Sequence, residues 1–315
     1  MTAAIRVEGL AKRYGNFAAV DDVSFDVKAG EIFGILGPNG AGKTTTLEII
    51  EGLQAPDSGQ VTVLGKDIQR DANWIKARIG VQLQSSAYFA FLTLHEILTL
   101  LGSFYPRRVP PNELLEMVGL ADRAKSRINQ LSIGQSQRFT AAASLVNDPE
   151  LVILDEPTTG LDPQARHNLW ELIQAIHARN VTVVLTTHYM EEAELLCQRL
   201  AIMDRGRIVA IDSPSELINR IETTYTIKLE SLQPLDDSQL KALGTSGNLN
   251  RTEFGPHAQP QRDNSYLLRL DKNPEALNRA INCIVGSGIS LKHMEVRPAT
   301  LEDVFLELTG NELRD

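Results

Sequence analysis

The fold of this chain is decided by the stretch Gly37-Pro38-Asn39-Gly40-Ala41-Gly42-Lys43-Thr44. It fits G-x-x-x-x-G-K-[ST], a loop whose glycines let backbone N–H groups close around a phosphate. The preceding residues 31–36 are typical of a buried strand, and residues 45–50 begin a helical pattern. The N-terminus of this helix adds a partial positive charge that favours phosphate. Lys43 is expected to reach the β- and γ-phosphates, and the Thr44 hydroxyl is expected to hold Mg²⁺. The sequence therefore predicts a nucleotide site.

The composition indicates a soluble cytoplasmic chain of about two domains. It has 315 residues, 43% of them hydrophobic, and a formal net charge of -9, which argues against nucleic acid as its main partner. Cys197 and Cys283 lie far apart, as expected in a reducing cytosol, and predict no zinc site. The N-terminus has no apolar signal segment, and the longest apolar stretch, residues 88–105, is too mixed to span a bilayer. Any membrane role is therefore expected to need a separate chain.

Strand patterns surround the phosphate loop in the N-terminal part of the chain. Residues 5–10 and 20–27 alternate between apolar and polar side chains, and residues 59–65 form a third short run bounded by glycines. We expect antiparallel strands beside the phosphate-loop unit. Tyr14 lies between the first two runs, and two interpretations stay open: its ring stacks on the base of the nucleotide, or it packs against the edge of the sheet.

A helical pattern fills the middle of the chain. The strand-like run 79–84 ends on Gln84 and is followed by the uncharged, aromatic residues 87–92. Thr93 and Glu96 have the spacing of a capping box, and apolar residues then recur at helical intervals. The sequence predicts a helical insertion in an α/β domain.

A second candidate anion site begins at Ser132. Ser132 and Gly134 precede a helical run of small residues, 139–146, and a hydroxyl, a glycine N–H and a helix N-terminus can together hold an anion. The same pattern is also that of an ordinary helix N-cap. Both interpretations stay open at this position.

Two further strand patterns end in residues suited to catalysis. The apolar run 151–154 is followed by Asp155, expected behind Mg²⁺, and Glu156, expected to position and deprotonate the attacking water. The alternative is a strand whose polar end meets solvent. The pattern of a buried strand over residues 181–187 is followed by His188, which either senses a γ-phosphate by hydrogen bonding or has a structural role.

In this order the motifs resemble the ATP-binding cassette (ABC) ATPases of ABC transporters, over residues 4–220. The resemblance implies ATP and Mg²⁺ as cofactors. It also implies an aromatic A-loop, a Walker A motif, a Q-loop, a signature at 131–135, a Walker B motif, a D-loop at 160–162 and a switch histidine. The residues that it implies for the nucleotide site are Tyr14, Gly37, Pro38, Asn39, Gly40, Ala41, Gly42, Lys43, Thr44, Thr45, Gln84, Ser132, Gly134, Gln135, Asp155, Glu156, Asp162 and His188.

The resemblance also implies a division of roles. The catalytic residues are Lys43, Glu156 and His188. The Mg²⁺ ligands are Thr44, Gln84 and Asp155. Two cassettes pair head to tail as a homodimer, so that Ser132 and the Gly134 N–H contact a γ-phosphate bound in the partner subunit. Hydrolysis removes that contact and loosens the dimer.

One position departs from the family's Leu-Ser-Gly-Gly-Gln signature. Ile133 stands where the family has its first Gly. If that position needs a positive φ, a β-branched residue there costs ~1–2 kcal/mol. We therefore expect an active but slower site.

The implied fold is α/β. It has a P-loop (RecA-like) core, an antiparallel β subdomain and an inserted helical subdomain over about residues 86–150, together forming an ATPase domain at 1–220. A small C-terminal α/β domain is expected at 221–315. Its expected strands are 225–230, 266–270 and 289–296, its helices 274–285 and 300–308, and its loop 248–265.

The C-terminal part narrows the resemblance. Residues 300–306 resemble the closing segment of ATP-binding subunits of ABC-2-type exporters, the daunorubicin-resistance-like group. This implies an ATPase subunit, peripheral on the inner face of the cell membrane, that powers export through a separate permease. The alternative for this domain is that it only stabilises the dimer. In the family, residues 87–92 face the permease, so Tyr88 and Phe89 are candidate contacts, unless they pack inside the helical insertion.

A non-transport ABC ATPase, of the translation or DNA-repair type, is the alternative function. DNA-repair types insert a long coiled coil between the Walker motifs, but the stretch between Lys43 and Asp155 is compact. Translation types usually carry two cassettes in one chain, and one cassette is present here. Both observations favour the transport ATPase.

Overall fold

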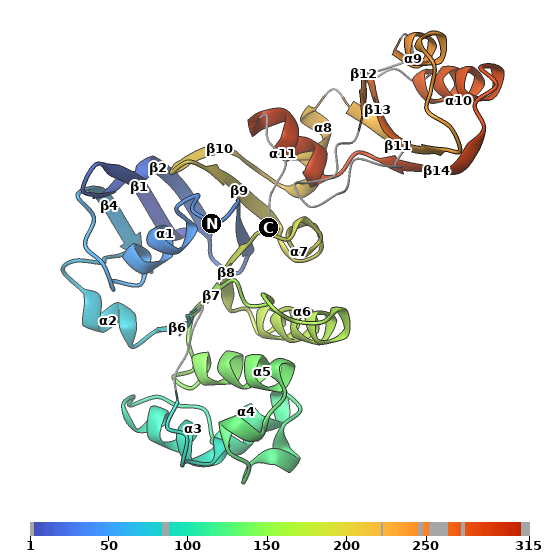
Figure 1. The fold of residues 1–315 in the computed structure, drawn as a ribbon. Helices are drawn as coiled ribbons and strands as arrows, with labels where there is room; N and C mark the ends of the chain where they lie inside the picture. Colours follow the sequence, from blue (N-terminus) through green and yellow to red (C-terminus); the bar gives the residue numbers. More distant parts are fainter. Residues whose placement is uncertain are drawn as a thin grey trace. The chain divides into compact units, whose positions relative to one another are not determined.

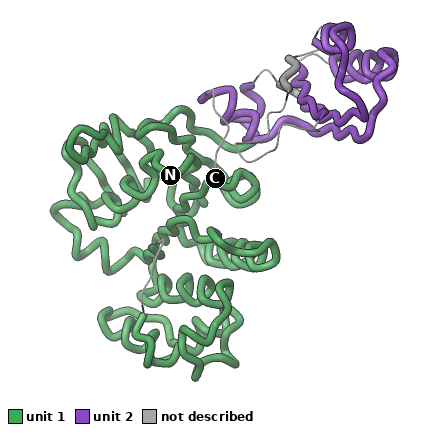
Figure 2. Tube along the Cα trace, in the orientation of Figure 1, with its two compact units in different colours: residues 1–214, 313–315 green, residues 215–312 purple. Residues whose placement is uncertain are grey.

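The computed structural model describes residues 3–83, 88–221, 223–244, 248–251, 264–271 and 275–309. The chain divides into two compact units, and the boundary falls between Pro214 and Ser215 (Figure 2). Each unit has its own hydrophobic core, as is typical of separate domains.

A six-stranded sheet forms the centre of the first unit (Figure 1). Its strand order is β10-β9-β3-β8-β7-β6, with β10 antiparallel to β9 and the other pairs parallel. The strands are β3 (Ile32–Leu36), β6 (Ile79–Gln82), β7 (Leu151–Asp155), β8 (Thr182–Thr187), β9 (Arg199–Asp204) and β10 (Arg207–Asp212). As predicted, β3, β7 and β8 are buried along their whole length, because parallel strands are covered on both faces.

A second, antiparallel sheet packs beside the first in the same unit. Its strand order is β2-β1-β4-β5. The strands are β1 (Ala3–Tyr14), β2 (Phe17–Lys28), β4 (Ser58–Val63) and β5 (Lys66–Asp67). One core cluster joins both sheets, and within it the rings of Phe25 and Phe33 stack with centroids 5.4 Å apart. The predicted antiparallel strands beside the phosphate-loop unit are therefore confirmed.

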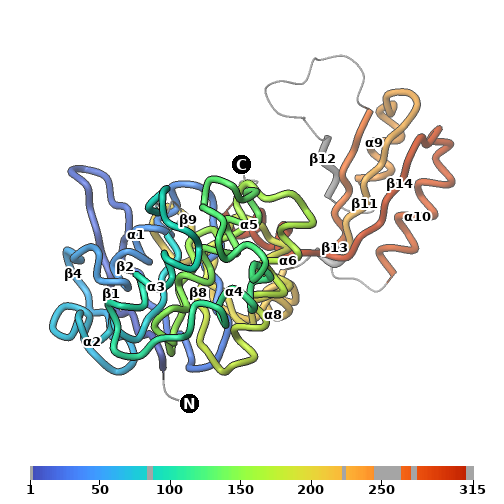
Figure 3. The backbone as a smooth tube through the Cα atoms, turned by 90° about the horizontal axis from the view of Figure 1, so that it is seen from below, coloured from blue at the N-terminus to red at the C-terminus, as the bar shows by residue number. Residues whose placement is uncertain are grey.

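The helical insertion lies between β6 and β7 (Figures 1 and 3). It contains α3 (Leu94–Ser103), α4 (Pro111–Met117), two 3₁₀ turns (Ala121–Arg123 and Ile128–Gln130) and α5 (Ile133–Ser144), and the three α-helices pack against one another. The predicted capping box opens α3. Glu96 N donates to Thr93 Oγ1 at 3.3 Å, and Thr93 N donates to Glu96 Oε2 at 2.8 Å.

The remaining helices of this part of the chain follow the strands. They are α1 (Lys43–Ile50), α2 (Ala72–Lys76), α6 (Pro163–Ala178), α7 (Met190–Leu196) and α8 (Pro214–Arg220), which starts at the unit boundary. Searching the described residues finds no helix with the length and apolar character needed to cross a membrane.

The second unit is a four-stranded antiparallel sheet with helices. Its strand order is β12-β13-β11-β14. Its elements are β11 (Thr223–Ser231), α9 (Asp237–Gly244), β12 (Asn248–Arg251), β13 (Ser265–Asp271), α10 (Ala276–Gly286), β14 (Leu291–Pro298) and α11 (Leu301–Thr309). The expectation of a loop over all of residues 248–265 was wrong for β12. A polar sequence is tolerated there because β12 is an edge strand. Residues 252–263 lie outside the described residues.

Candidate functional site

Three parallel strands end side by side at one edge of the central sheet. Leu36 of β3 is opposite Thr187 of β8, and Thr186 of β8 is opposite Asp155 of β7. The phosphate loop follows β3 directly, and the other two strands lead into the predicted catalytic acid and the predicted switch histidine. The register therefore brings together three motifs that lie far apart in the sequence, as is typical of sites at the carboxyl ends of parallel strands.

Two glycines of the phosphate loop are required by close backbone approach. A Cβ at Gly37 would lie 2.2 Å from Met203 O, and a Cβ at Gly42, where φ is 103°, would lie 2.3 Å from Ala19 O. The residues between β3 and α1 are Gly37, Pro38, Asn39, Gly40, Ala41 and Gly42, and α1 opens with Lys43, Thr44 and Thr45. This places the loop at a helix N-terminus, where backbone N–H groups can bind a phosphate.

The Lys43 ammonium is buried and makes three polar contacts. It donates to Gly37 O at 2.8 Å and to Pro38 O at 3.1 Å. Its Nζ also lies 3.1 Å from Glu156 Oε1, and both side chains of this ion pair are buried. A phosphate in the loop would compete with these oxygens for the same cation.

Glu156 has a strained backbone. Its φ is 46°, in the left-handed region, where a non-glycine residue costs ~1–2 kcal/mol. Two hydrogen bonds stabilise Glu156 in this conformation. Glu156 N donates to Thr186 Oγ1 at 2.9 Å, and Thr159 Oγ1 donates to Glu156 Oε2 at 3.1 Å. His188 Nδ1 lies 3.3 Å from the same Oε2 without a hydrogen bond, so this contact is electrostatic when the ring is protonated. Strain of this kind is typical of functional positions.

The charge state of Glu156 follows from these contacts. Burial raises the pKa of its carboxyl and is the largest single influence. The Lys43 ammonium, His188 and the hydrogen bond from Thr159 act in the opposite direction and hold the pKa below its ordinary value. The group is therefore a carboxylate at neutral pH, able to accept a hydrogen bond or a proton from water.

Asp155 is the buried acid at the end of β7, and it accepts a hydrogen bond from Thr186 Oγ1. The Asp155 carboxylate and the Thr44 hydroxyl are both oxygen donors, the ligand type that Mg²⁺ prefers. This donor set fits a Mg²⁺ ion bound together with phosphate oxygens. Gln84, the third metal ligand that the resemblance implies, lies outside the described residues.

Ser132 is the N-cap of α5. Gln135 N donates to Ser132 Oγ at 3.2 Å, and Ser132 N donates to Gln135 Oε1 at 3.0 Å. A Cβ at Gly134 would lie 2.9 Å from the Cβ of Ala165 on α6, so glycine fits closely there. Within the described part of the chain, no hydrogen bond or ion pair links these signature residues to Lys43 or Glu156. The hydrogen bonds of the Ser132 cap are thus complete within α5.

Ile133 carries no backbone strain. It is the first residue of α5 and is not among the described residues with positive φ. Its side chain is 68% exposed. The condition behind the expected strain is therefore not met, and a slower site no longer follows from it.

Tyr14 and Asp162 are each held by a hydrogen bond near their own element. The Tyr14 ring is 48% exposed at the end of β1, and its hydroxyl donates to Gln54 Oε1 at 2.6 Å. Lys12 Nζ lies 5.9 Å from the ring centroid. Asp162 is the N-cap of α6 and accepts a hydrogen bond from Ala165 N at 2.9 Å. An exposed, anchored ring suits stacking better than edge packing.

The aromatic residues after β6 divide into two kinds. Tyr88 makes an edge-to-face contact with the buried ring of Phe139, with centroids 5.3 Å apart. Phe89 and Phe91 are exposed, and their rings lie 5.9 Å apart. Tyr88 is therefore half-buried against the insertion, whereas Phe89 and Phe91 present an apolar surface to solvent.

Sequence reasoning missed two residues that hold the acids in place. Thr186 contacts both Asp155 and Glu156, and Thr159 donates to Glu156. Thr186 is one of three threonines in β8, so the sequence gave no signal that set it apart. Thr159 gave no signal either, because threonine is ordinary in a turn.

Known proteins share this architecture. The family model described as ABC transporter matches residues 20–159. Nod factor export ATP-binding protein I of Paraburkholderia xenovorans is 40% identical over 321 residues, covering 99% of this chain and 99% of its own length. The protein of the same name from Ralstonia nicotianae is 40% identical over 100% of this chain and 96% of its own length. These similarities extend over both units.

Solved structures agree with the fold. The cbiO1 protein of Clostridium perfringens, part of an ABC transporter complex, has a TM-score of 0.63 at 26% identity and covers 70% of this chain and 92% of its own. A dimeric ATP-binding cassette bound to ADP and phosphate has a TM-score of 0.61 at 27% identity and covers 66% and 98%. The predicted α/β cassette fold is confirmed.

Proposed function

This chain belongs to the ABC transporter ATPase family, and from that membership we propose that it powers export through a separate membrane permease. It is an ATP-hydrolysing transport subunit. The translation and DNA-repair alternative is set aside, because relatives that match over their full length are export ATP-binding proteins. The proposal concerns the direction of transport and leaves the cargo open, since cargo binding belongs to the permease.

The position of the Glu156 carboxylate supports ATP hydrolysis, and the names of the relatives support export as the direction of transport. The carboxylate lies between Lys43, at 3.1 Å, and His188, at 3.3 Å, beside the phosphate loop. Lys43 would neutralise the β- and γ-phosphates, and Glu156 would orient water and take its proton. His188 would hydrogen-bond the γ-phosphate. Mg²⁺, when held by Thr44 and Asp155, would supply charge neutralisation on the phosphate oxygens.

The second wall of the site would come from another cassette. Ser132 caps α5 and Gly134 lies in its first turn, and among the described residues neither shares a hydrogen bond or ion pair with Lys43 or Glu156. A head-to-tail homodimer would place them against the γ-phosphate of the partner. The dimer would then form with ATP bound and loosen after hydrolysis.

The permease would hold this chain at the inner face of the cell membrane. Phe89 and Phe91 give an exposed apolar surface next to the helical insertion, which suits docking. Replacing both with Ser should uncouple transport while the isolated chain still hydrolyses ATP. If transport by the assembled exporter is unchanged, this surface is not the docking site.

ATP turnover and ATP-dependent dimerisation of the purified chain test the hydrolysis and homodimer parts of the proposal. The wild type should hydrolyse ATP, and Glu156→Gln should bind ATP, slow turnover at least ~100-fold and accumulate as a dimer. Size-exclusion chromatography with light scattering, with and without Mg²⁺–ATP, measures the dimer. A wild type that binds ATP but neither dimerises nor turns over would overturn the homodimer and require a different partner cassette.

A further inference from the structure

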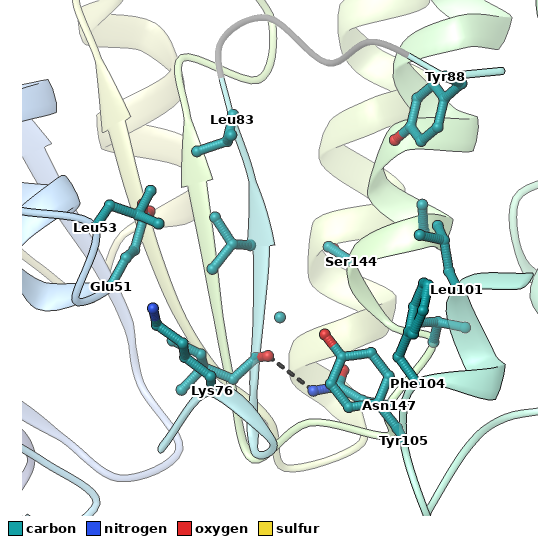
Figure 4. A pocket seen from close by; sticks show the side chains of 15 residues that line it. Glu51, Leu53, Lys76, Leu83, Tyr88, Leu101, Phe104, Tyr105, Ser144 and Asn147 are labelled. Carbon is teal, nitrogen blue, oxygen red and sulfur yellow. Dashed lines mark hydrogen bonds between the residues drawn. The ribbon is translucent and has the colours of Figure 1, made fainter. Parts of the chain in front are cut away.

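Two buried glutamates of the first unit, Glu51 and Glu192, differ in how they are held. Glu51 follows α1 directly and lines a cavity of about 450 Å³ between the central sheet and the helical insertion (Figure 4). It is 2% exposed, and neither of its carboxylate oxygens has a hydrogen-bond partner among the described residues. Glu192 on α7 is 0% exposed, and its Oε1 accepts a hydrogen bond from Trp170 Nε1 of α6 at 2.9 Å. Glu192 thus joins two helices inside the protein, and a buried acid of this kind needs an explanation.

The residues just before α7 include the predicted switch histidine, His188. Its Nδ1 is buried and has no hydrogen-bond partner among the described residues. The ring packs instead on the ring of Tyr189, with centroids 4.1 Å apart. The Arg166 guanidinium of α6 lies in turn 4.0 Å from the centroid of the Tyr189 ring. The direction of the His188 ring therefore depends on the short link from β8 to α7 and on the helix behind it.

Both ends of this link are anchored. At the end of β8, Thr187 Oγ1 accepts a hydrogen bond from Tyr189 N at 2.9 Å, and Thr187 O accepts one from Gly37 N of the phosphate loop at 3.3 Å. At the other end, Glu192 is the third residue of α7, and its bond to Trp170 holds the first turn of α7 on α6. The link is therefore fixed between the phosphate loop and α6.

One face of α6 supports the link at two points. Arg166 and Trp170 are four residues apart on this helix, so their side chains lie on the same face. Arg166 packs on Tyr189, and Trp170 holds Glu192. Loss of the Glu192 bond would leave the ring contact with Arg166 as the remaining support of these two.

The Glu192 carboxyl lies among groups from the same elements. Burial raises its pKa and is the largest influence. The Thr187 hydroxyl, the Trp170 N–H and the Thr158 hydroxyl act in the opposite direction, and the charge of Arg166 does so too. The pKa stays above its ordinary value, so burial favours the uncharged form. An uncharged Gln, whose oxygen can still accept from Trp170, is therefore a close substitute.

We propose that Glu192 is a positioning residue for ATP hydrolysis, which fixes the direction of the His188 ring by tying the first turn of α7 to Trp170. The inference rests on the proposed function, in which His188 hydrogen-bonds the γ-phosphate. Glu192 is fully buried and acts through His188. A group misplaced by about 1 Å can slow a reaction about a hundredfold, so the effect belongs in kcat. ATP binding at the phosphate loop should be little changed.

The kinetic constants of ATP turnover test this role. Glu192→Leu removes the acceptor for Trp170 and should lower kcat at least about tenfold, while KM for ATP stays within about twofold. Glu192→Gln should keep kcat within about threefold of the wild type. Glu191→Leu is the matched control, since Glu191 is an exposed acid on the same helix, and should leave both constants unchanged. A folded Glu192→Leu variant with the wild-type kcat, or a Glu192→Gln variant as slow as Glu192→Leu, would overturn the inference.

Nuclear magnetic resonance of the histidine-labelled chain gives a readout that needs no turnover. The ring signals of His188, assigned by their loss in His188→Ala, should shift in Glu192→Leu and keep their positions in Glu191→Leu. Unchanged His188 signals in Glu192→Leu would contradict the proposed positioning. If Glu192→Leu does not fold, Trp170→Phe takes its place in each measurement, because it removes the donor of the same hydrogen bond.

A double variant tests whether Glu192 acts through His188. In a His188→Ala background, Glu192→Leu should lower kcat by less than about twofold further, with Lys43→Ala giving the background rate. Two effects that multiply in full would give Glu192 a purely structural role and overturn the inference. If His188→Ala alone keeps the wild-type kcat, the proposed role of His188 fails. If His188→Ala is slow and Glu192→Leu is not, only the Glu192 inference fails.

Discussion

Replacing Glu51 with Gln should stabilise the first unit by an amount that grows with pH. The pKa of this carboxyl is raised from 4.5 to about 8, first by burial and then by Asp155 and Glu48. The folded state therefore holds the proton more tightly than the unfolded state. As the pH rises from 4.5 through about 8, the unfolded state ionises first, and the free energy of unfolding falls. An uncharged Gln side chain removes this loss.

The size of the effect follows from the shift. Each pH unit between the two pKa values removes ~1.4 kcal/mol from the free energy of unfolding. Glu51→Gln should thus exceed the wild type by ~3 kcal/mol near pH 7 and by ~4 kcal/mol near pH 8. Close to pH 5 the two proteins should be nearly equal, because a protonated Glu and a Gln are similar in size and both lack partners here.

Urea unfolding followed by tryptophan fluorescence measures this difference. The chain has 2 tryptophans, Trp74 on α2 and Trp170 on α6, and both lie in the first unit, so the signal reports that unit alone. Glu171→Gln on α6 is the control, since Glu171 is an exposed acid of the same unit and is not among the groups that raise the pKa of Glu51. The control should show no gain that grows with pH. A difference between wild type and Glu51→Gln that stays constant from about pH 5 to about pH 8 would refute the reasoning.

Three further changes test the site. Tyr14→Ala should weaken ATP binding roughly tenfold through lost stacking on the base, measured by calorimetry; unchanged affinity would favour a purely structural Tyr14. Thr186→Val should destabilise the first unit by ~1–3 kcal/mol in urea unfolding, because Asp155 and the Glu156 N–H lose a buried partner; an effect near zero would show that other groups replace it. Ile133→Gly should leave ATP turnover within about twofold, since Ile133 is unstrained; a collapse of turnover would give its exposed side chain a positive role.

Local sequence patterns predicted the elements that the site is built on. The phosphate loop, the strand before it and the capping box at Thr93 each depend on neighbouring residues, so they can be read from the chain directly. The two acids at the end of β7, Asp155 and Glu156, could also be predicted from the sequence, because an apolar run that ends in two carboxylates is unusual. The sequence therefore predicted the features that depend on residues close together in the chain.

The features that the sequence did not predict depend on contacts between residues far apart in the chain. The strain at Glu156 depends on Thr186 from a neighbouring strand, and the exposure of Ile133 depends on how α5 is oriented. The edge strand β12 needed β13 as a partner before its polar sequence became a strand. These features combine segments that are distant in sequence, and one sequence by itself does not show which segments meet.

Glu51 and Glu156 show that the sequence alone does not reveal which partners a buried acid has in the folded chain. Both are glutamates close to the phosphate-loop helix in space, but Glu156 has Lys43, His188 and Thr159 around it, whereas neither oxygen of Glu51 has a described partner. Glu156 is thus ionised, as a residue that takes a proton from water must be. The raised pKa of Glu51 predicts that its carboxylate form lowers the stability of the free chain. Glu51→Gln should therefore raise stability at neutral pH, whereas Glu156→Gln should act on ATP turnover.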